Sequence, residues 1–309
     1  MPIAPLTSPN VPPWTPATLV TQTRFDSWLT LVLVVAAGLY VYGVHRLRLR
    51  GDRWPAWRTV AFLGPGLGGI AAVTLLGLGA YDTVLLSAHM VQHMALSMIA
   101  PIFLALGAPV TLALRTLPAR PRRWLVAVLH SRPVRVLSFP LVSYALFVAN
   151  PFVLYFTGLY RLTLENALLH EWVHAHFIVT GCLFFWPLLG LDPLPGRWPY
   201  PGRLVLMLLS TPFHAILGLT IMQSQTLLAG DWYPSLGLSW ADPWADQEVA
   251  GGILWAGGEL VSVTMIAVLF VQWVRHSERE AARIDRALDR AEEQEAQAGA
   301  AQPVSGESL

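Results

Sequence analysis

The chain contains 309 residues, of which 54% are hydrophobic and 13% are charged, and its mean hydropathy is +0.51. This composition excludes an ordinary water-soluble domain, whose surface needs more charge, and indicates a protein of the lipid bilayer. A formal net charge of +1 gives no basis for nucleic-acid binding, and the single cysteine, Cys182, excludes a disulfide framework and a Cys-rich metal site.

Apolar stretches dominate the chain. A bilayer core about 30 Å thick requires about 20 apolar residues per helix, and seven such stretches are separated by Pro, Gly or charged residues. We therefore predict an all-α, polytopic membrane protein, a seven-transmembrane-helix bundle. The predicted spans are residues 28–45, 56–80, 84–106, 134–157, 166–190, 203–229 and 249–274. Around them we predict an extracytoplasmic N-terminal segment (1–25), one transmembrane domain (26–275) and a cytoplasmic charged helix with a disordered tail (276–309).

The arginines predict the orientation of the bundle. Eighteen of the 20 basic residues fall in the first, third and fifth connections or after the last span, and only Arg24 and Arg161 fall on the other side. Connections that stay in the cytoplasm carry this excess of positive charge. The pattern therefore places the N-terminus outside and the C-terminus inside.

Two histidine pairs lie within the predicted spans. The third span contains His89 and His93 in HMVQH, and the fifth contains His170 and His174 in HEWVH. Residues four apart lie on one face of a helix, and the rise per residue places both pairs in the outer half of the membrane. Because an unpaired imidazole in hydrocarbon is costly, we predict that these four histidines are metal ligands between the two helices.

Further polar groups are predicted near the same level. His214, on the sixth span, is either a further ligand or a hydrogen-bonding group between helices. Glu259, on the seventh, either hydrogen-bonds as a neutral carboxyl, handles protons or orients a ligand imidazole. His176 lies on the other side of its helix from His174, so we predict that it packs or supports a ligand. Glu171 is predicted to face headgroup water.

Ligand type alone leaves the metal open, because neutral imidazole suits copper, zinc, iron and nickel. Met90 and Met94 lie beside the histidine face of the third span. Methionine at helical spacing is more often a packing residue, but a thioether next to imidazole suits Cu(I). A spacing of four residues is too short for two stacked haems, while a single haem with two histidine ligands stays open. We predict copper, as Cu(I), in preference to haem.

Four motifs on four predicted spans resemble one family. They are SAHMVQHMALSMIAPIFLALGAPVTLALR, HEWVHAHFIVTGCLFFWPLLGLDP, STPFHAILG and DQEVAGGILWAGGEL. In this order they are similar to the CtaG family of polytopic assembly factors for caa-type cytochrome c oxidase, over roughly residues 25–275. The resemblance implies a multi-pass protein of the bacterial plasma membrane that is needed for an active haem–copper oxidase and helps to supply its copper.

The resemblance also carries residues over by position. The residues that match the four motifs in turn are His89 and His93, His170 and His174, His214, and Asp246 with Gln247. We predict that Asp246 and Gln247 form an entrance or a partner-facing surface, the alternative being a helix N-cap by Asp246.

The predicted function is that of a metallochaperone in respiratory chain biogenesis. It binds copper through its intramembrane histidines and delivers it to the catalytic subunit of cytochrome c oxidase. Its other partners are a copper donor and the lipid bilayer. Because the sequence contains no nucleophile or acid–base constellation, we predict that the protein is not an enzyme. The alternatives are a haem-binding membrane redox protein, a metal or proton transporter, and a purely structural scaffold for the oxidase.

Overall fold

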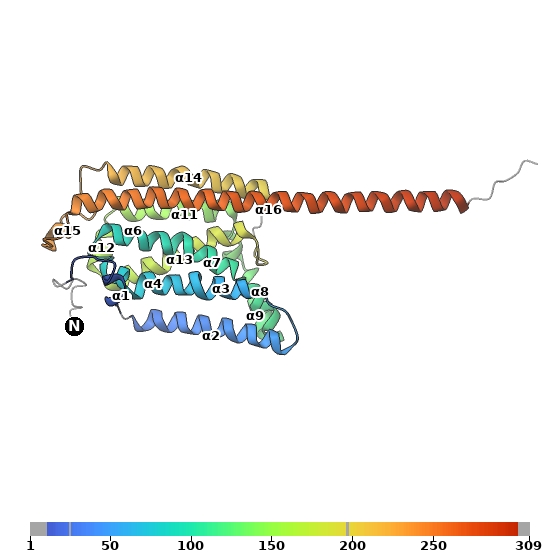
Figure 1. The fold of residues 1–309 in the computed structure, drawn as a ribbon, viewed down its shortest axis with the longest axis horizontal. Helices are drawn as coiled ribbons and strands as arrows, with labels where there is room; N and C mark the ends of the chain where they lie inside the picture. Colours follow the sequence, from blue (N-terminus) through green and yellow to red (C-terminus); the bar gives the residue numbers. More distant parts are fainter. Residues whose placement is uncertain (1–10, 25, 196–197, 302–309) are drawn as a thin grey trace, which may run out of the picture.

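The computed structural model describes residues 11–24, 26–195 and 198–301. Within these residues every regular element is a helix, and the helices run side by side as an elongated bundle (Figure 1). The predicted all-α class is therefore confirmed. Residues 1–10 of the predicted N-terminal segment and residues 302–309 of the predicted tail lie outside the described residues.

Within the described part of the chain, six helices or helical runs are long and apolar enough to cross a membrane. They are α2 (Ser27–Leu49); the run of α3 (Ala56–Ala61), η1 (Phe62–Gly68), α4 (Gly69–Leu75) and α5 (Gly77–Tyr81); the run of α6 (Leu86–Met94), η2 (Ala95–Ile99), α7 (Ala100–Leu106) and α8 (Pro109–Thr116); α13 (Ala167–Leu189); α14 (Tyr200–Met222); and α16 (Pro243–Ala301). A seventh crossing forms if α11 (Pro140–Phe156) and α12 (Leu159–Glu165) act as one bent span. The shorter helices are α1 (Thr18–Thr21), α9 (Ala119–Leu129), α10 (Arg132–Leu137) and α15 (Trp232–Ser235).

The predicted span at residues 134–157 differs from the structure. The helix α11 begins only at Pro140, because proline suits the first position of a helix and the preceding backbone is extended. At its other end Thr157 is extended, and α12 continues at 72° to α11. The bend brings Tyr155 of α11 against Tyr160 of α12, with ring centroids 5.3 Å apart.

The helical run that starts with α6 contains a π-helical turn, η2, against which α13 packs. A Cβ atom added to Gly181 of α13 would lie 2.1 Å from the carbonyl oxygen of Ser97 in η2. Only glycine therefore permits this approach of the two backbones. The close packing fixes the beginning of α6 relative to the beginning of α13, at the end of the bundle that carries α12 and α15 (Figure 1). We call this end the α15 end.

The last helix, α16, packs against α14 and α6 and then continues without a break to Ala301, far beyond the bundle (Figure 1). The sequence divides this region into a span at residues 249–274 and a separate charged helix. In the structure the charged segment is a direct extension of the span.

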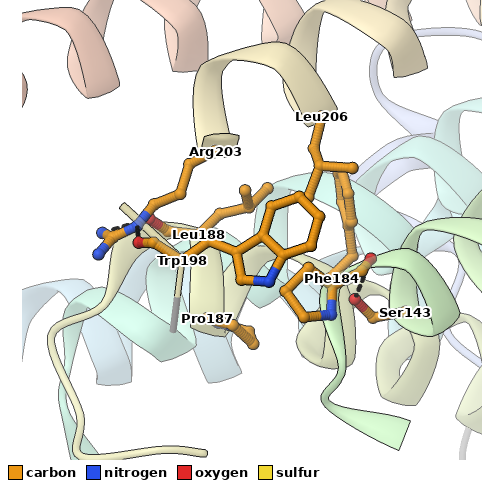
Figure 2. A pocket seen from close by; sticks show the side chains of 8 residues that line it. Ser143, Phe184, Pro187, Leu188, Trp198, Arg203 and Leu206 are labelled. Atoms are coloured by element: carbon orange, nitrogen blue, oxygen red, sulfur yellow. Dashed lines mark hydrogen bonds between the residues drawn. The ribbon is translucent and has the colours of Figure 1, made fainter. Parts of the chain in front are cut away.

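The end of the bundle opposite the α15 end holds a small pocket between α11, α13 and α14, in which the Trp198 ring lies among Pro187, Phe184 and Leu206 (Figure 2). Beside it, Arg203 donates from Nε to the Trp198 carbonyl at 2.6 Å and from Nη1 to the Leu188 carbonyl at 3.1 Å. The second bond satisfies a carbonyl in the last turn of α13. The pocket is thus a packed helix junction.

Candidate metal centre

Three buried side chains of metal-ligand type meet at the α15 end. Asp82 lies in the turn after α5, and His170 and His174 lie in the first two turns of α13. Each offers one ligand atom, and these atoms all lie within 4.8 Å of one another. His170 Nε2 donates to Asp82 Oδ2 at 2.8 Å, and His174 Nε2 lies 3.7 Å from the same oxygen. We call these residues the Asp82–His170–His174 group.

The start of α13 positions the two histidines. The Asn166 side chain accepts hydrogen bonds from the backbone N–H groups of the second and third helical residues, at 3.0 and 3.2 Å. This N-cap begins the helix at Ala167. His170 therefore lies in the first turn and His174 one turn later on the same face. Their ring centroids are 4.5 Å apart, so the HxxxH spacing does bring its two imidazoles together.

Arg24 and Glu171 lie at the edge of the group, where the side chains are 25% and 17% exposed. Arg24 Nη2 donates to Glu171 Oε1 at 2.8 Å, and Arg24 Nη1 lies 3.4 Å from Asp82 Oδ2. Glu171 Oε2 lies 3.8 Å from His174 Nδ1. Glu171, expected to face headgroup water, instead pairs with Arg24 against the buried histidines.

The group contains a buried anion and several unpartnered atoms. Burial alone would raise the pKa of the Asp82 carboxyl, but His170 and Arg24 outweigh it and hold this pKa below its usual value. Among the described residues, Asp82 Oδ1, His170 Nδ1 and both ring nitrogens of His174 have no hydrogen-bond partner. A buried polar atom without a hydrogen-bond partner costs about 1–3 kcal/mol of folding free energy. A ligand that contacts these atoms would remove part of this cost, and this favours its binding.

The other histidine pair, on α6, lies next to the group. His89 is buried, its Nε2 hydrogen-bonds the Tyr155 hydroxyl at 3.1 Å, and its ring centroid lies 6.0 Å from that of His170. His93 lies one turn further along α6, with its ring 4.2 Å from Phe177 and 5.8 Å from Tyr155. The structure therefore brings the two HxxxH pairs to neighbouring positions, with His89 nearer the group than His93.

The remaining predicted polar residues are more dispersed. His214 is buried on α14, with its ring 5.7 Å from Phe147 and Gly258 of α16 directly beside it. His176 is exposed on the outward side of α13, in a groove with tryptophan side chains. Glu259 is half-buried on α16. None of these three belongs to the Asp82–His170–His174 group.

The two methionines lie on α6 but pack in different surroundings. Met90 is fully buried in the hydrophobic core, with 0% exposure. Met94 is also buried, and its Cε lies within 3.6 Å of the Cβ position of Gly257 on α16. Met94 thus faces the α16 side of its helix.

Asp246 and Gln247 at the start of α16 have partners inside the protein. Asp246 accepts hydrogen bonds from the backbone N–H groups of Leu86 and Ser87 and from the Ser87 hydroxyl, and so caps α6. The Gln247 side chain is buried, accepts from Leu228 N at 2.8 Å and donates to the Thr226 carbonyl at 3.1 Å. Asp246 therefore caps a neighbouring helix, and Gln247 holds the loop that precedes α15.

Asp82 and Tyr155 contact the predicted histidines and Arg24 contacts Asp82, but these three are not among the predicted site residues. Two signals point to Asp82: it is the only carboxylate in the short connection between the second and third spans, and it lies four residues before the third-span helix. Arg24 is one of the two arginines that the charge distribution places on the outer side. Only the fold brings these residues together with the histidines.

The donor set fits a transition-metal ion. Imidazole nitrogen suits copper, zinc, iron and nickel, and a carboxylate oxygen accompanies it in many such sites. The unpartnered atoms of Asp82, His170 and His174 are of these types. The group is therefore a candidate metal site, and donor type does not choose among these metals.

The fold and this group define a class: a polytopic helical membrane protein with a buried cluster of metal-ligand side chains. The chain belongs to the Caa3_CtaG family, described as cytochrome c oxidase caa3 assembly factor, whose sequence model matches residues 38–276. This match confirms the family that the four motifs predicted.

Mycobacterial proteins are among the relatives of this chain. Uncharacterized proteins of Mycobacterium bovis and Mycobacterium tuberculosis are each 41% identical to it over 285 residues, which is 90% of this chain and 43% of the relative. An uncharacterized protein of Mycobacterium leprae is 38% identical over 274 residues, 86% of this chain and 41% of the relative. The chain thus spans less than half the length of these relatives. No solved structure matches it.

Proposed function

We propose that this chain acts in the assembly of a haem–copper cytochrome c oxidase by carrying copper for it. The description of its family supports the role in oxidase assembly. The observation that carries the metal-binding part of the proposal is the Asp82–His170–His174 group, which is buried, compact and left with unpartnered donor atoms. The choice of copper rests on the family description, which names a cytochrome c oxidase. Copper is the cargo, and the chain supplies the ligands.

In this proposal His170 and His174 bind copper through imidazole nitrogen, and Asp82 binds it through a carboxylate oxygen. His89 and His93 remain proposed as ligands too. Both have an unpartnered buried Nδ1, and the His89 ring lies 6.0 Å from that of His170. Ligands from two helices that can be exchanged one at a time suit transfer rather than permanent storage.

The proposed arrangement in the membrane has seven crossings, with α11 and α12 forming one bent span. The distribution of arginine supports an N-terminus outside and a C-terminus inside, in a bacterial plasma membrane. The Asp82–His170–His174 group then lies near the extracytoplasmic surface, where a copper donor reaches it, and the oxidase catalytic subunit receives copper within the membrane. The role is one of binding and transfer, without catalysis.

Metal analysis of the purified full chain tests the proposal. We expect stoichiometric copper in the wild type after loading with Cu(I), and loss of that copper in His174→Ala, because His174 supplies two of the unpartnered nitrogen atoms. His176→Ala is the matched control, since this histidine lies on the same helix but is exposed outside the group. Oxidase activity of cells that carry each variant should fall with His174→Ala and not with His176→Ala.

Three results would contradict the proposal and favour its alternatives. A Soret absorption band in the purified protein, lost in His174→Ala, would assign the histidines to haem. Metal or proton flux across liposomes that contain the protein would indicate a transporter. Equal copper content and oxidase activity in wild type and His174→Ala would leave only a structural role in assembly.

A further inference from the structure

We propose that Arg24 sets the charge selectivity of the metal centre and makes it a site for a monovalent cation. This inference rests on the proposed function, because it assumes that the Asp82–His170–His174 group binds a metal ion. It adds a residue that lies on none of the motifs and that binds no metal itself.

Arg24 reaches both carboxylates of the site. Its Nη2 lies 2.8 Å from Glu171 Oε1 and its Nη1 lies 3.4 Å from Asp82 Oδ2. Among the described residues, Arg24 is the arginine that pairs with Asp82 and Glu171. The imidazoles of His170 and His174 are the other ionisable groups beside these two carboxylates. One guanidinium therefore partly neutralises the whole site.

The backbone holds Arg24 in this position. Its N–H donates to the Leu75 carbonyl at the end of α4, at 3.0 Å. Two residues later the Asp26 side chain accepts from Trp28 N and Leu29 N and caps α2. The segment that carries Arg24 is thus tied to a helix on each side. The Arg24 side chain, 25% exposed, lies at the edge of the buried group.

A count of charges gives the selectivity. Metal-bound imidazole is neutral, so the fixed charges are those of Asp82, Glu171 and Arg24: two negative and one positive. The net charge of −1 is balanced by one monovalent cation. A divalent cation leaves an excess positive charge in a buried site, or must displace Arg24 from its ion pairs, and both outcomes cost free energy.

The size of this effect is measurable. At an effective dielectric constant of about 20, two unit charges about 6 Å apart interact by an energy equal to about a 100-fold change in affinity. Because the Arg24 side chain is partly exposed, solvent reduces this value. We therefore expect Arg24 to shift the preference between Cu(I) and a divalent ion by at least about 10-fold.

The test compares affinities for two metals in the purified full chain. Cu(I) is titrated anaerobically against a competing chelator and Zn(II) against a chelating dye, for wild type, Arg24→Gln and Arg24→Lys. We expect Arg24→Gln to raise the Zn(II) affinity relative to Cu(I) by at least about 10-fold, and Arg24→Lys to keep the wild-type ratio because it keeps the charge. Arg161→Gln is the matched control, because Arg161 pairs with Glu165 and Asp231 away from the group.

Glu171→Gln provides an independent measurement with the opposite sign. It removes a negative charge, so the ratio should move toward Cu(I), and the result stands even if an Arg24 variant does not fold. An unchanged ratio in Arg24→Gln, or a ratio in Glu171→Gln that moves toward Zn(II), overturns the role of Arg24. Failure of the wild type to bind either metal overturns the proposed function instead, and this inference with it.

Discussion

The two ends of the bundle bury charge in opposite ways. At the end opposite α15, Asp192 is 3% exposed, and its carboxylate accepts from Val110 N, from the backbone and hydroxyl of Thr111, and from Trp186 Nε1. At the α15 end, Asp82 is fully buried, and its Oδ1 has no hydrogen-bond partner among the described residues. Both carboxylates bear the cost of burial, but only Asp192 has hydrogen-bond donors within the described residues for both of its oxygens, whereas Asp82 has them for Oδ2 alone.

This difference is the reason to propose a function for the group at one end and a structural role for Asp192 at the other. Asp192 joins α8 to the end of α13 and caps the N-terminus of α8, so its role is complete within the chain. Asp82 and the two histidines leave acceptor and nitrogen atoms open at one place. Burial of a charge is therefore a weak indicator of function by itself, and burial with converging unpartnered atoms is a stronger one.

The largest expected effect is on metal binding. Asp82→Asn replaces an anionic ligand by a neutral amide of the same shape, so we expect the copper affinity to fall by at least about 100-fold. The thermal unfolding midpoint in detergent should fall only modestly, because the amide oxygen can still accept from His170 Nε2 and the amide nitrogen takes the place of the open Oδ1, while the ion pair with the partly exposed Arg24 is lost. Isothermal titration and a thermal melt of the same sample check both statements, and a strong loss of thermal stability with copper binding retained would break the comparison.

The next effect is on stability at the opposite end. Asp192→Asn exchanges an acceptor for an amide that must turn a donor toward groups that are themselves donors. We expect a loss of about 1–3 kcal/mol of unfolding free energy, seen as a lower unfolding midpoint, with copper affinity unchanged. A fall in copper affinity comparable to that of Asp82→Asn would show that the two ends are not independent.

The smallest effect sharpens the comparison with a third carboxylate. Asp246 lies at the α15 end but has its partners in Leu86 and Ser87. Asp246→Ala removes the cap of α6 and should cost about 1 kcal/mol of stability, while copper affinity falls by less than about 10-fold, since a shift of α6 reaches His89 only indirectly. Complete loss of copper binding in Asp246→Ala would contradict the comparison. It would show that copper binding depends on any carboxylate at the α15 end, and not on the presence of unpartnered ligand atoms.

The sequence allowed the fold class and one half of the site to be predicted. Apolar length identified the membrane helices, because a bilayer imposes that length on any span. The HxxxH spacing placed His170 and His174 on one face, because helical periodicity alone fixes it. The family could be predicted because its four motifs, and their order, can be read directly from the sequence.

The rest depends on tertiary structure. Depth along a helix can be counted from its first residue, but Asp82 lies in a turn and Arg24 in an extended segment, where no periodicity says which way a side chain points. The bend at Thr157 and the π turn in η2 likewise arise from local packing. The prediction for Glu171 used only its position near the end of a span. Its ion pair is with Arg24, which lies 147 residues away in the sequence, so local sequence could not predict it.

The unbroken course of α16 has a mechanical consequence. Its 59 residues form a rod about 90 Å long. The first turn is hydrogen-bonded to the start of α6 through Asp246, and the distal part projects beyond the other helices (Figure 1). Because the helix is unbroken between these two points, a force applied to the projecting part is transmitted along α16 into the bundle. Inside the bundle that force reaches α14 first, at the contact of Tyr200 with His276, and reaches the start of the helix that bears His89 only at the other end of the rod, through Asp246.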